Sequence, residues 1–370
     1  MIKTKKVIAL SLSLCLAFLF CTVPAKAMSE DLGGSSKSGY TTSASYSVTD
    51  LPDGGKDYVF FVEGVENHYL VPPEGFNPVV ASDEQLATYA FPPRPDVEDF
   101  DAYSQWVSLM KNYETTPLPE IEITVKPVED ENVSTTQTRS VTGTMRTTNW
   151  AGYVADLGAN SSNFYTQVQM DYKHPTITDL GGTSVTSYWV GLGGYNTHKL
   201  VQAGTATHNT AIHYAWYEYL SDTGETVAAQ HLESLTINPG DRMHVYISFQ
   251  RANNKFSYYI ANNTTGKSAS GIVNLSAATQ FDGSTAEWIV ERAEIPTTSG
   301  GTYLTSLGNF GEISITNCQA TKNTSNTWYD LGQLNVKKCV MYNNSGSYIL
   351  AEPGSITSSN RFICYFRNYH

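Results

Sequence analysis

The chain is poor in charged residues, and its charge is unevenly spread. Asp, Glu, Lys and Arg make up 16% of the 370 residues, below the usual fraction of about 25%. The 23 basic residues are outnumbered by 35 acidic ones, so we expect no nucleic-acid partner, because phosphate binding requires clustered Lys and Arg. Residues 28–140 hold 20 acids and 6 bases, within a formal net charge of −12 for the whole chain. This asymmetry predicts parts with different roles.

Long hydrophobic runs are also scarce. The longest, at residues 7–20, has 14 residues and is shorter than the about 20 that a membrane span needs. Three lysines precede this run, and the small-residue site Ala25-Lys26-Ala27 follows it. The pattern is typical of a secretory signal peptide over residues 1–27. We therefore expect a secreted, extracellular protein that has no membrane association once the signal is cleaved.

Cysteine is rare, with five copies. Two of them lie in the signal peptide, which leaves Cys318, Cys339 and Cys364. An odd number permits at most one internal disulfide, and we expect Cys339 and Cys364 to pair because both lie in strand-like runs. None of the three has the glycine-rich or helix-opening context of a catalytic cysteine.

The common hydrolase signatures are absent from the sequence. It contains no Gly-x-Ser-x-Gly elbow and no His-Glu-x-x-His zinc helix. The sequence Asp222-Thr223-Gly224 matches the loop of aspartic proteases, but it occurs once, and that chemistry needs two such carboxylates. A hairpin tip is the simpler interpretation, since Asp and Gly favour tight turns.

The pattern of residues divides the chain into a mixed first part and a β-rich second part. In the first part, residues 82–90 resemble a short helix with a capping box formed by Ser82 and Gln85, and Asp101 is expected to cap a second helix. Residues 114–145 read as a linker. From Asn149 onward, short runs rich in Tyr, Val, Ile, Thr and Trp alternate with turn residues, which predicts an all-β fold of antiparallel strands.

Two predicted strands carry polar residues in unusual positions. In the run 199–204, Gln202 follows apolar residues and precedes two small ones, which would let a ligand backbone approach closely. In the run 286–291, alternation puts Glu287, Ile289 and Glu291 on one face and Trp288 and Val290 on the other. Taken singly, each run is more simply interpreted as ordinary exposed strand positions.

Taken together and in order, five segments resemble the glutamic peptidase family, the eqolisins. The segments are Asn149-Trp150-Ala151-Gly152-Tyr153, Trp189-Val190-Gly191-Leu192-Gly193-Gly194, Val201-Gln202-Ala203-Gly204, Ala215-Trp216-Tyr217-Glu218 and Ala286-Glu287-Trp288-Ile289-Val290-Glu291. The resemblance implies a concanavalin-like antiparallel β-sandwich domain at residues 146–370. It also implies that residues 28–145 are an acidic, partly helical prosegment and linker.

The resemblance further implies a catalytic dyad on the concave face of the sandwich. The family glutamine falls on Gln202 and the family glutamate on Glu291, the second Glu of its strand. The positions near the cleft, with an expected role in substrate binding, are Trp150, Trp189, Trp216 and Glu218. The implied reaction is peptide-bond hydrolysis by an activated water, with no metal, no cofactor and no covalent intermediate. The expected partners are protein or peptide substrates and the chain's own prosegment as inhibitor, on a monomeric enzyme.

Two departures from the family pattern affect the expected chemistry. Gly193 and Tyr214 stand where fungal members commonly carry Asp. Fewer neighbouring carboxylates would lower the repulsion on Glu291, so we expect this group to ionise readily. The alternative function is a lectin-like sandwich without catalysis, in which the tryptophans stack on sugar rings. An inactive relative of the enzymes is a third interpretation.

Overall fold

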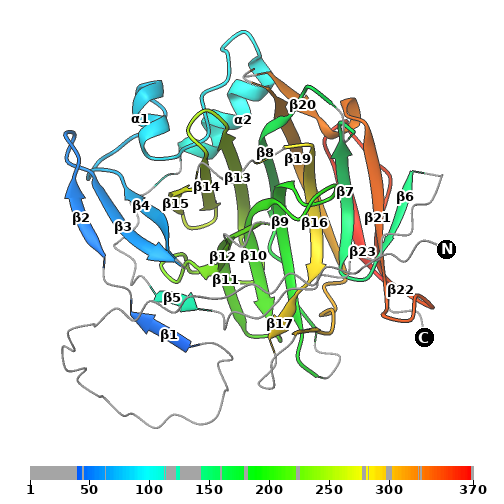
Figure 1. Cartoon of the computed structure of the whole chain (residues 1–370). Coiled ribbons are helices and arrows are strands. Elements are labelled where there is room, and N and C mark those ends of the chain that lie inside the picture. The colour runs from blue at the N-terminus through cyan, green and yellow to red at the C-terminus, as the bar shows by residue number, and fades with distance from the viewer. Residues whose placement is uncertain are drawn as a thin grey trace, which may run out of the picture. The chain divides into compact units, whose positions relative to one another are not determined.

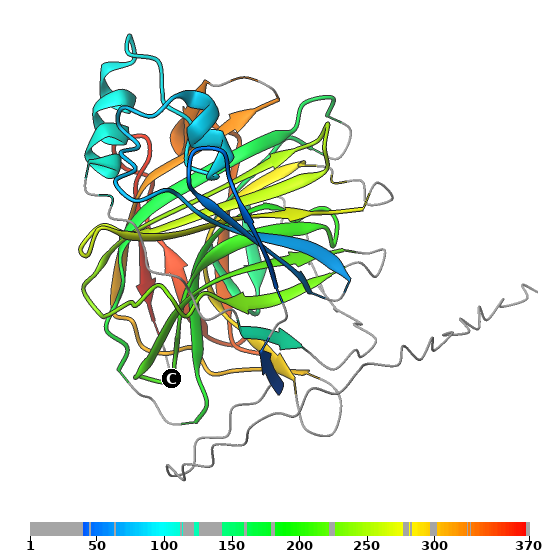
Figure 2. The same cartoon turned by 90° about the vertical axis from the view of Figure 1, so that its left-hand side faces the viewer.

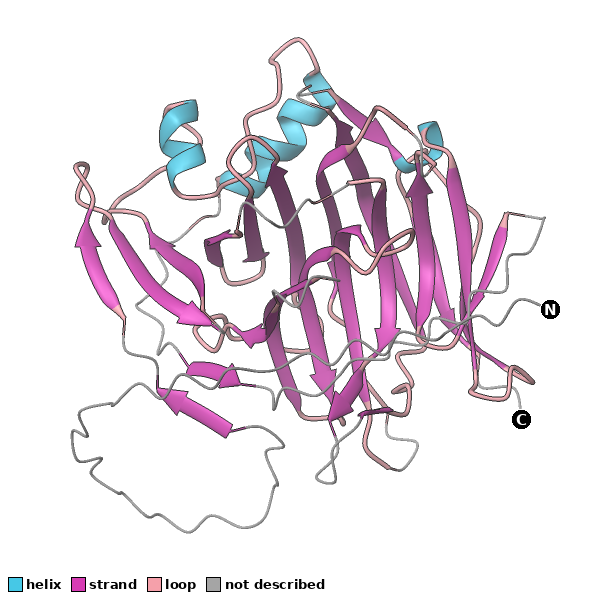
Figure 3. Ribbon diagram, viewed as in Figure 1, coloured by secondary structure: helices cyan, strands magenta, loops and turns pink. Residues whose placement is uncertain are grey.

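The computed structural model describes residues 40–43, 46–62, 64–111, 113, 122–125, 143–158, 161–178, 182–221, 226–276, 281, 283–296, 302–323, 325 and 327–367. All of them lie in one unit that spans Ser38–His370. Strands dominate this unit, and its few helices lie at the top of the view in Figure 3. The predicted signal peptide and the Asp222-Thr223-Gly224 turn fall outside the described residues. No helix of the described part is long and apolar enough to cross a membrane.

One layer of the fold, here called sheet I, carries the residues singled out in the sequence. Its strands pair antiparallel in the order β12-β11-β10-β9-β16-β7-β21. They are β7 (Trp150–Asp156), β9 (Val185–Gly193), β10 (Leu200–His208), β11 (Ile212–Leu220), β12 (Val227–His231), β16 (Thr285–Arg292) and β21 (Val336–Tyr342).

The second layer, sheet II, pairs antiparallel in the order β2-β3-β4-β15-β14-β13-β8-β19-β23-β22. Because β22 also pairs with β21, the two sheets are continuous on that side. The strands are β2 (Ser47–Asp50), β3 (Lys56–Val62), β4 (Val65–Val71), β8 (Tyr165–Lys173), β13 (Arg242–Gln250), β14 (Lys255–Asn262), β15 (Lys267–Asn274), β19 (Glu312–Lys322), β22 (Ile349–Pro353) and β23 (Phe362–Phe366).

The core lies between the two sheets. Strand alternation directs Tyr188 and Val190 of β9 and Trp288 of β16 into it, where they meet Met170 and Val245 of sheet II. The Trp288 indole also donates a hydrogen bond to the backbone carbonyl of Gln169, at 2.8 Å. Residues of sheet I at the alternate positions therefore point to its outer face. The predicted all-β sandwich is confirmed.

The N-terminal part extends sheet II and covers one of its faces. Figure 1 shows β2, β3 and β4 continuing sheet II beyond β15, and Figure 2 faces that edge. Helix α1 (Asp83–Thr88) begins at Ser82 with the predicted capping box. Helix α2 (Phe100–Met110) is capped by Asp99, whose side chain accepts from the backbone N–H of Ala102, so the prediction of Asp101 as the cap was wrong.

Shorter elements complete the fold. β6 (Thr144–Thr147) pairs parallel to β21, β20 (Trp328–Asp330) pairs with β19, β1 (Tyr40–Ser43) with β5 (Glu122–Val125), and β17 (Glu294–Pro296) with β18 (Thr302–Leu304); η1 spans Leu331–Gln333.

The cysteine prediction was wrong. Cys318, Cys339 and Cys364 are all buried and free. Cys339 lies on β21 and Cys364 on β23, with β22 between them. Two strand spacings amount to about 10 Å between Cα atoms, whereas a disulfide needs less than about 7 Å.

Candidate active site

Most of the residues singled out in the sequence gather on the outer face of sheet I. Trp189 and Trp216 belong to a cluster on this face together with Ile289 and, at its margin, Trp150. The side chains are well covered: Trp189, Gln202 and Glu218 are 0%, 4% and 9% exposed. The alternation predicted for residues 286–291 is confirmed, since Ile289 lies in this cluster and Trp288 in the core.

Gln202 lies in a row of residues that crosses four strands. On β10 it is the register partner of Glu218 on β11 and of Gly191 on β9. Gly191 is in turn the partner of Glu287 on β16. The row therefore reads Glu287, Gly191, Gln202, Glu218, so that two carboxylates flank one amide across a glycine.

The Gln202 amide is oriented by the carboxylate beside it. Its Nε2 donates to Oε2 of Glu218 at 2.7 Å. Its Oε1 is buried and accepts no hydrogen bond from a described group. Because a side-chain amide has two N–H donors and one acceptor oxygen, one N–H and the oxygen remain available for a bound molecule.

Neighbouring side chains close over Gly191 in the middle of the row. A Cβ at this position would lie 3.1 Å from Oε2 of Glu287, 2.7 Å from Cζ3 of Trp189 and 2.9 Å from Cδ1 of Leu200. The Glu287 carboxylate and the Trp189 indole thus lean over the glycine. Any side chain at 191 would have to push these groups away.

Glu291 accepts hydrogen bonds from a different set of residues. Its Oε1 accepts from Nδ2 of Asn149 and from Nε1 of Trp150, both at 2.9 Å, and its Oε2 accepts from Nε1 of Trp189 at 2.8 Å. Burial raises the pKa of the Glu291 carboxyl to about 7, against the three hydrogen bonds, which lower it, and with a further upward contribution from the charge of Glu218. The expectation that Glu291 ionises readily was therefore wrong, because burial outweighs the missing neighbours.

Gln202 and Glu291 lie on the same face of sheet I, in different rows. Glu291 is the register partner of Ser187, whose partner on β10 is Ala206, four residues beyond Gln202. Glu287 is the glutamate of β16 in the row of Gln202. The side chain of Glu291 nevertheless lies within range of the charge of Glu218, the carboxylate that holds the Gln202 amide.

The tryptophans form the wall beside this row. Trp150 and Trp189 meet edge to face, with ring centroids 5.0 Å apart and planes at 78°. The Trp189 indole reaches from Gly191 to Glu291, since its Cζ3 lies over the glycine and its Nε1 donates to the carboxylate. Trp216 is 5% exposed, and its Nε1 has no partner among the described groups. This N–H is therefore a second donor available to a bound molecule.

Residues 148–364 match a family model described as the peptidase A4 family. The chain belongs to this family. Membership confirms the resemblance to the glutamic peptidases and the enzyme class expected from it, a glutamic-type peptidase. Among the described residues, no group of three His, Cys, Asp or Glu side chains is arranged to hold a metal ion.

Solved structures of this family are similar in fold. Scytalido-glutamic peptidase with a peptide-based transition state analogue aligns with a TM-score of 0.50 at 18% sequence identity, over 60% of this chain and 98% of that one. SCP-B, a member of the eqolisin family in a complex with the tripeptide Ala-Ile-His, aligns with a TM-score of 0.49 at the same identity and coverage. No curated protein matched this chain.

Proposed function

We propose that this family member is an endopeptidase in which Gln202 and Glu291 activate a water molecule against a peptide bond. The observation that carries the proposal is their shared neighbour Glu218, which holds the Gln202 amide and whose charge reaches Glu291. A carboxyl group whose pKa is about 7 can take up and return a proton near neutral pH.

The reaction follows from the groups present. Ionised Glu291 accepts a proton from water while the Gln202 Oε1 orients that water, and the water oxygen attacks the carbonyl carbon. The free N–H of Gln202 donates to the oxyanion that forms, a contribution of about 3 kcal/mol for one such donor. Protonated Glu291 then donates its proton to the leaving nitrogen, the C–N bond breaks, and the carboxylate is restored. The step needs no covalent enzyme intermediate.

The tryptophans position Glu291 in this scheme. The indoles of Trp150 and Trp189 donate to its carboxylate and give it an apolar wall. Trp216 and Glu218 complete the substrate-binding surface on the other side of Gln202. The peptide-based analogue bound to scytalido-glutamic peptidase supports a peptide as the ligand of this face.

The decisive experiment compares three variants with the parent protein on one peptide substrate. Glu291→Gln and Gln202→Ala are expected to lose nearly all turnover. Glu287 is fully buried in the row of Gln202, so Glu287→Gln should retain most of the turnover. If Glu287→Gln is the inactive variant and Glu291→Gln is active, the catalytic glutamate is Glu287.

Secretion and control form the second part of the proposal. The N-terminal signal pattern supports export, with residues 28–145 holding the monomeric enzyme inactive until a cut near 139–147. The excess of 20 acids over 6 bases in residues 28–140 supports a separate role for this part. N-terminal sequencing of the secreted active form tests it: a start at residue 28 would contradict activation by this cut.

The alternative, a lectin-like sandwich, has one observation in its favour, the tryptophans beside buried amides on one face. Sugar binding requires no carboxylate that activates a water beside the amide. A parent protein that bound oligosaccharides and cleaved no peptide at any pH would favour this alternative.

A further inference from the structure

The N-terminal part is joined to the sandwich by a β-strand pairing. Residues Glu66–Tyr69 of β4 pair with Gly271–Asn274 of β15. A Cβ at Gly271 would lie 2.3 Å from the carbonyl oxygen of His68, so this position of β15 accommodates β4 only as glycine. Without β4, the N–H and C=O groups of β15 that face it would lose their partners.

Beneath this seam, β3 and β4 contribute to the core that the two sheets share. Phe60, Val62, Val65 and Tyr69 are 5%, 0%, 5% and 3% exposed and belong to the same cluster as the core residues of sheets I and II. A prosegment that merely covers a finished domain would not supply its interior.

Polar groups of the core also depend on β4. Asn67 is fully buried, and its Oδ1 accepts a hydrogen bond from the Tyr217 hydroxyl at 2.9 Å. Tyr217 belongs to β11 of sheet I, so this bond crosses the whole sandwich. The Tyr69 hydroxyl lies 3.2 Å from Oγ of Ser234. Removing β4 would leave the Tyr217 hydroxyl buried without its acceptor.

The helical segment covers the other face of sheet II near the same edge. Leu86, Tyr89, Trp106 and Met110 are each at most 5% exposed and pack in one cluster with Tyr246, Tyr259 and Ala261 of β13 and β14. Phe91 contacts Tyr259 with ring centroids 4.8 Å apart.

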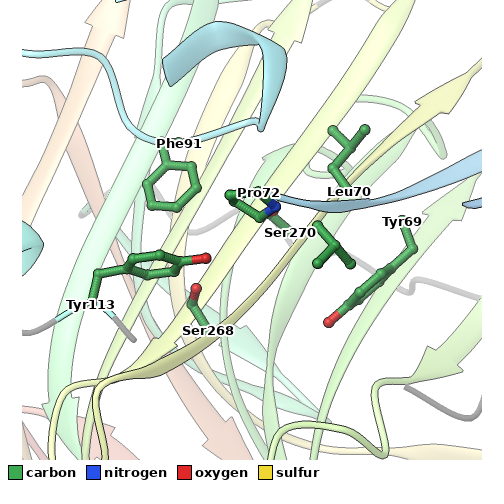
Figure 4. A pocket seen from close by; sticks show the side chains of 8 residues that line it. Tyr69, Leu70, Pro72, Phe91, Tyr113, Ser268 and Ser270 are labelled. Carbon is green, nitrogen blue, oxygen red and sulfur yellow. The ribbon is translucent and has the colours of Figure 1, made fainter. Parts of the chain in front are cut away.

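The seam where β4 meets β15 is closely packed. Figure 4 shows Pro72 and Leu70 beside Ser268 and Ser270 of β15, with Phe91 nearby. The cavity they line has a volume of about 10 Å³, room for one water at most.

We propose that residues 47–113 are a permanent part of the enzyme, which stay bound as a second, noncovalent chain after cleavage near 139–147. The cut rests on the processing proposed above, whereas the association does not depend on it or on activity. Cleavage would then break the covalent link between residues 47–113 and the first strand of sheet I. The pairing of β4 with β15 in sheet II would stay intact.

The test replaces residues 130–138 with the recognition sequence of a specific protease, cuts the folded full-length protein, and applies it to a sizing column at pH 7. The two fragments are expected to elute together and to separate only on a denaturing gel. Separate elution of the fragment that starts after the cut, folded or not, would overturn the proposal. The readout is association, so a failure of the proposed catalysis would not affect it.

A matched pair of variants shows whether the buried surface is responsible. Phe60 is buried and Phe61, its neighbour on β3, is 58% exposed. After the cut, Phe60→Ala is expected to release the N-terminal fragment at least tenfold more readily than Phe61→Ala, which should behave as the parent. Equal release by both variants would contradict a role for the shared core.

Discussion

The Gln202 amide donates to the Glu218 carboxylate at 2.7 Å, on strands β10 and β11 that pair directly. This relationship depends on rigid backbone register and not on a loop. In the proposed dyad, an amide held in this way can stabilise a transition state without reorganisation.

Glu218 is expected to contribute through the amide it orients. Replacing it in Glu218→Gln weakens the bond at 2.7 Å from Gln202, and a hydrogen bond to a charged group contributes roughly 1.5–3 kcal/mol. We expect kcat to fall by about tenfold or more with little change in KM, measured on one peptide. Glu233→Gln is the control, since the Glu233 side chain is 50% exposed; equal loss in both variants would remove the orienting role.

Gly191→Ala is expected to abolish turnover while the protein still folds. The added methyl group would meet Cζ3 of Trp189 at 2.7 Å, so it would displace the indole that donates to Glu291. Activity assays together with a thermal unfolding curve check this prediction. An active Gly191→Ala protein would show that the reaction does not depend on the position of this indole.

Stability should depend on pH through Glu291. Its pKa is about 7 in the folded chain, above the ordinary value of 4.5. Below pH 4.5 both states are protonated, and between the two values only the unfolded state ionises, so the free energy of unfolding falls as pH rises through this window. The loss is at most about 3 kcal/mol. Denaturant unfolding at pH 4 and pH 7 should give a smaller difference for Glu291→Gln than for the parent.

The bond between Asn67 and Tyr217 predicts a coupled effect on stability. Asn67→Ala leaves a buried hydroxyl without its acceptor, at a cost of about 1–3 kcal/mol. Adding Tyr217→Phe to this variant should cost less than Tyr217→Phe does in the parent, because the orphaned group is then removed. Urea unfolding of the four proteins gives the coupling energy, and strictly additive effects would contradict the bond.

The sequence was sufficient for the sandwich, for the face that carries Gln202 and Glu218, and for the capping box at Ser82. Those features follow from alternation and from local turn and cap chemistry. The rows of the sheet could not be predicted in the same way. Glu287 and Glu291 share a face, and only the pairing of β9 with both β10 and β16 shows which one lies in the row of Gln202. The disulfide prediction was wrong for a similar reason, since the sequence does not reveal that β22 lies between Cys339 and Cys364.

The pairing of β15 with β4 has a practical consequence for making this enzyme. A recombinant fragment that begins at residue 146 would present β15 as a bare sheet edge, next to core residues stripped of Phe60 and Tyr69. Such edges recruit strands from other molecules and lead to aggregation. The smallest soluble, well-behaved form is therefore expected to begin before Ser47, or to be assembled from two polypeptides made together.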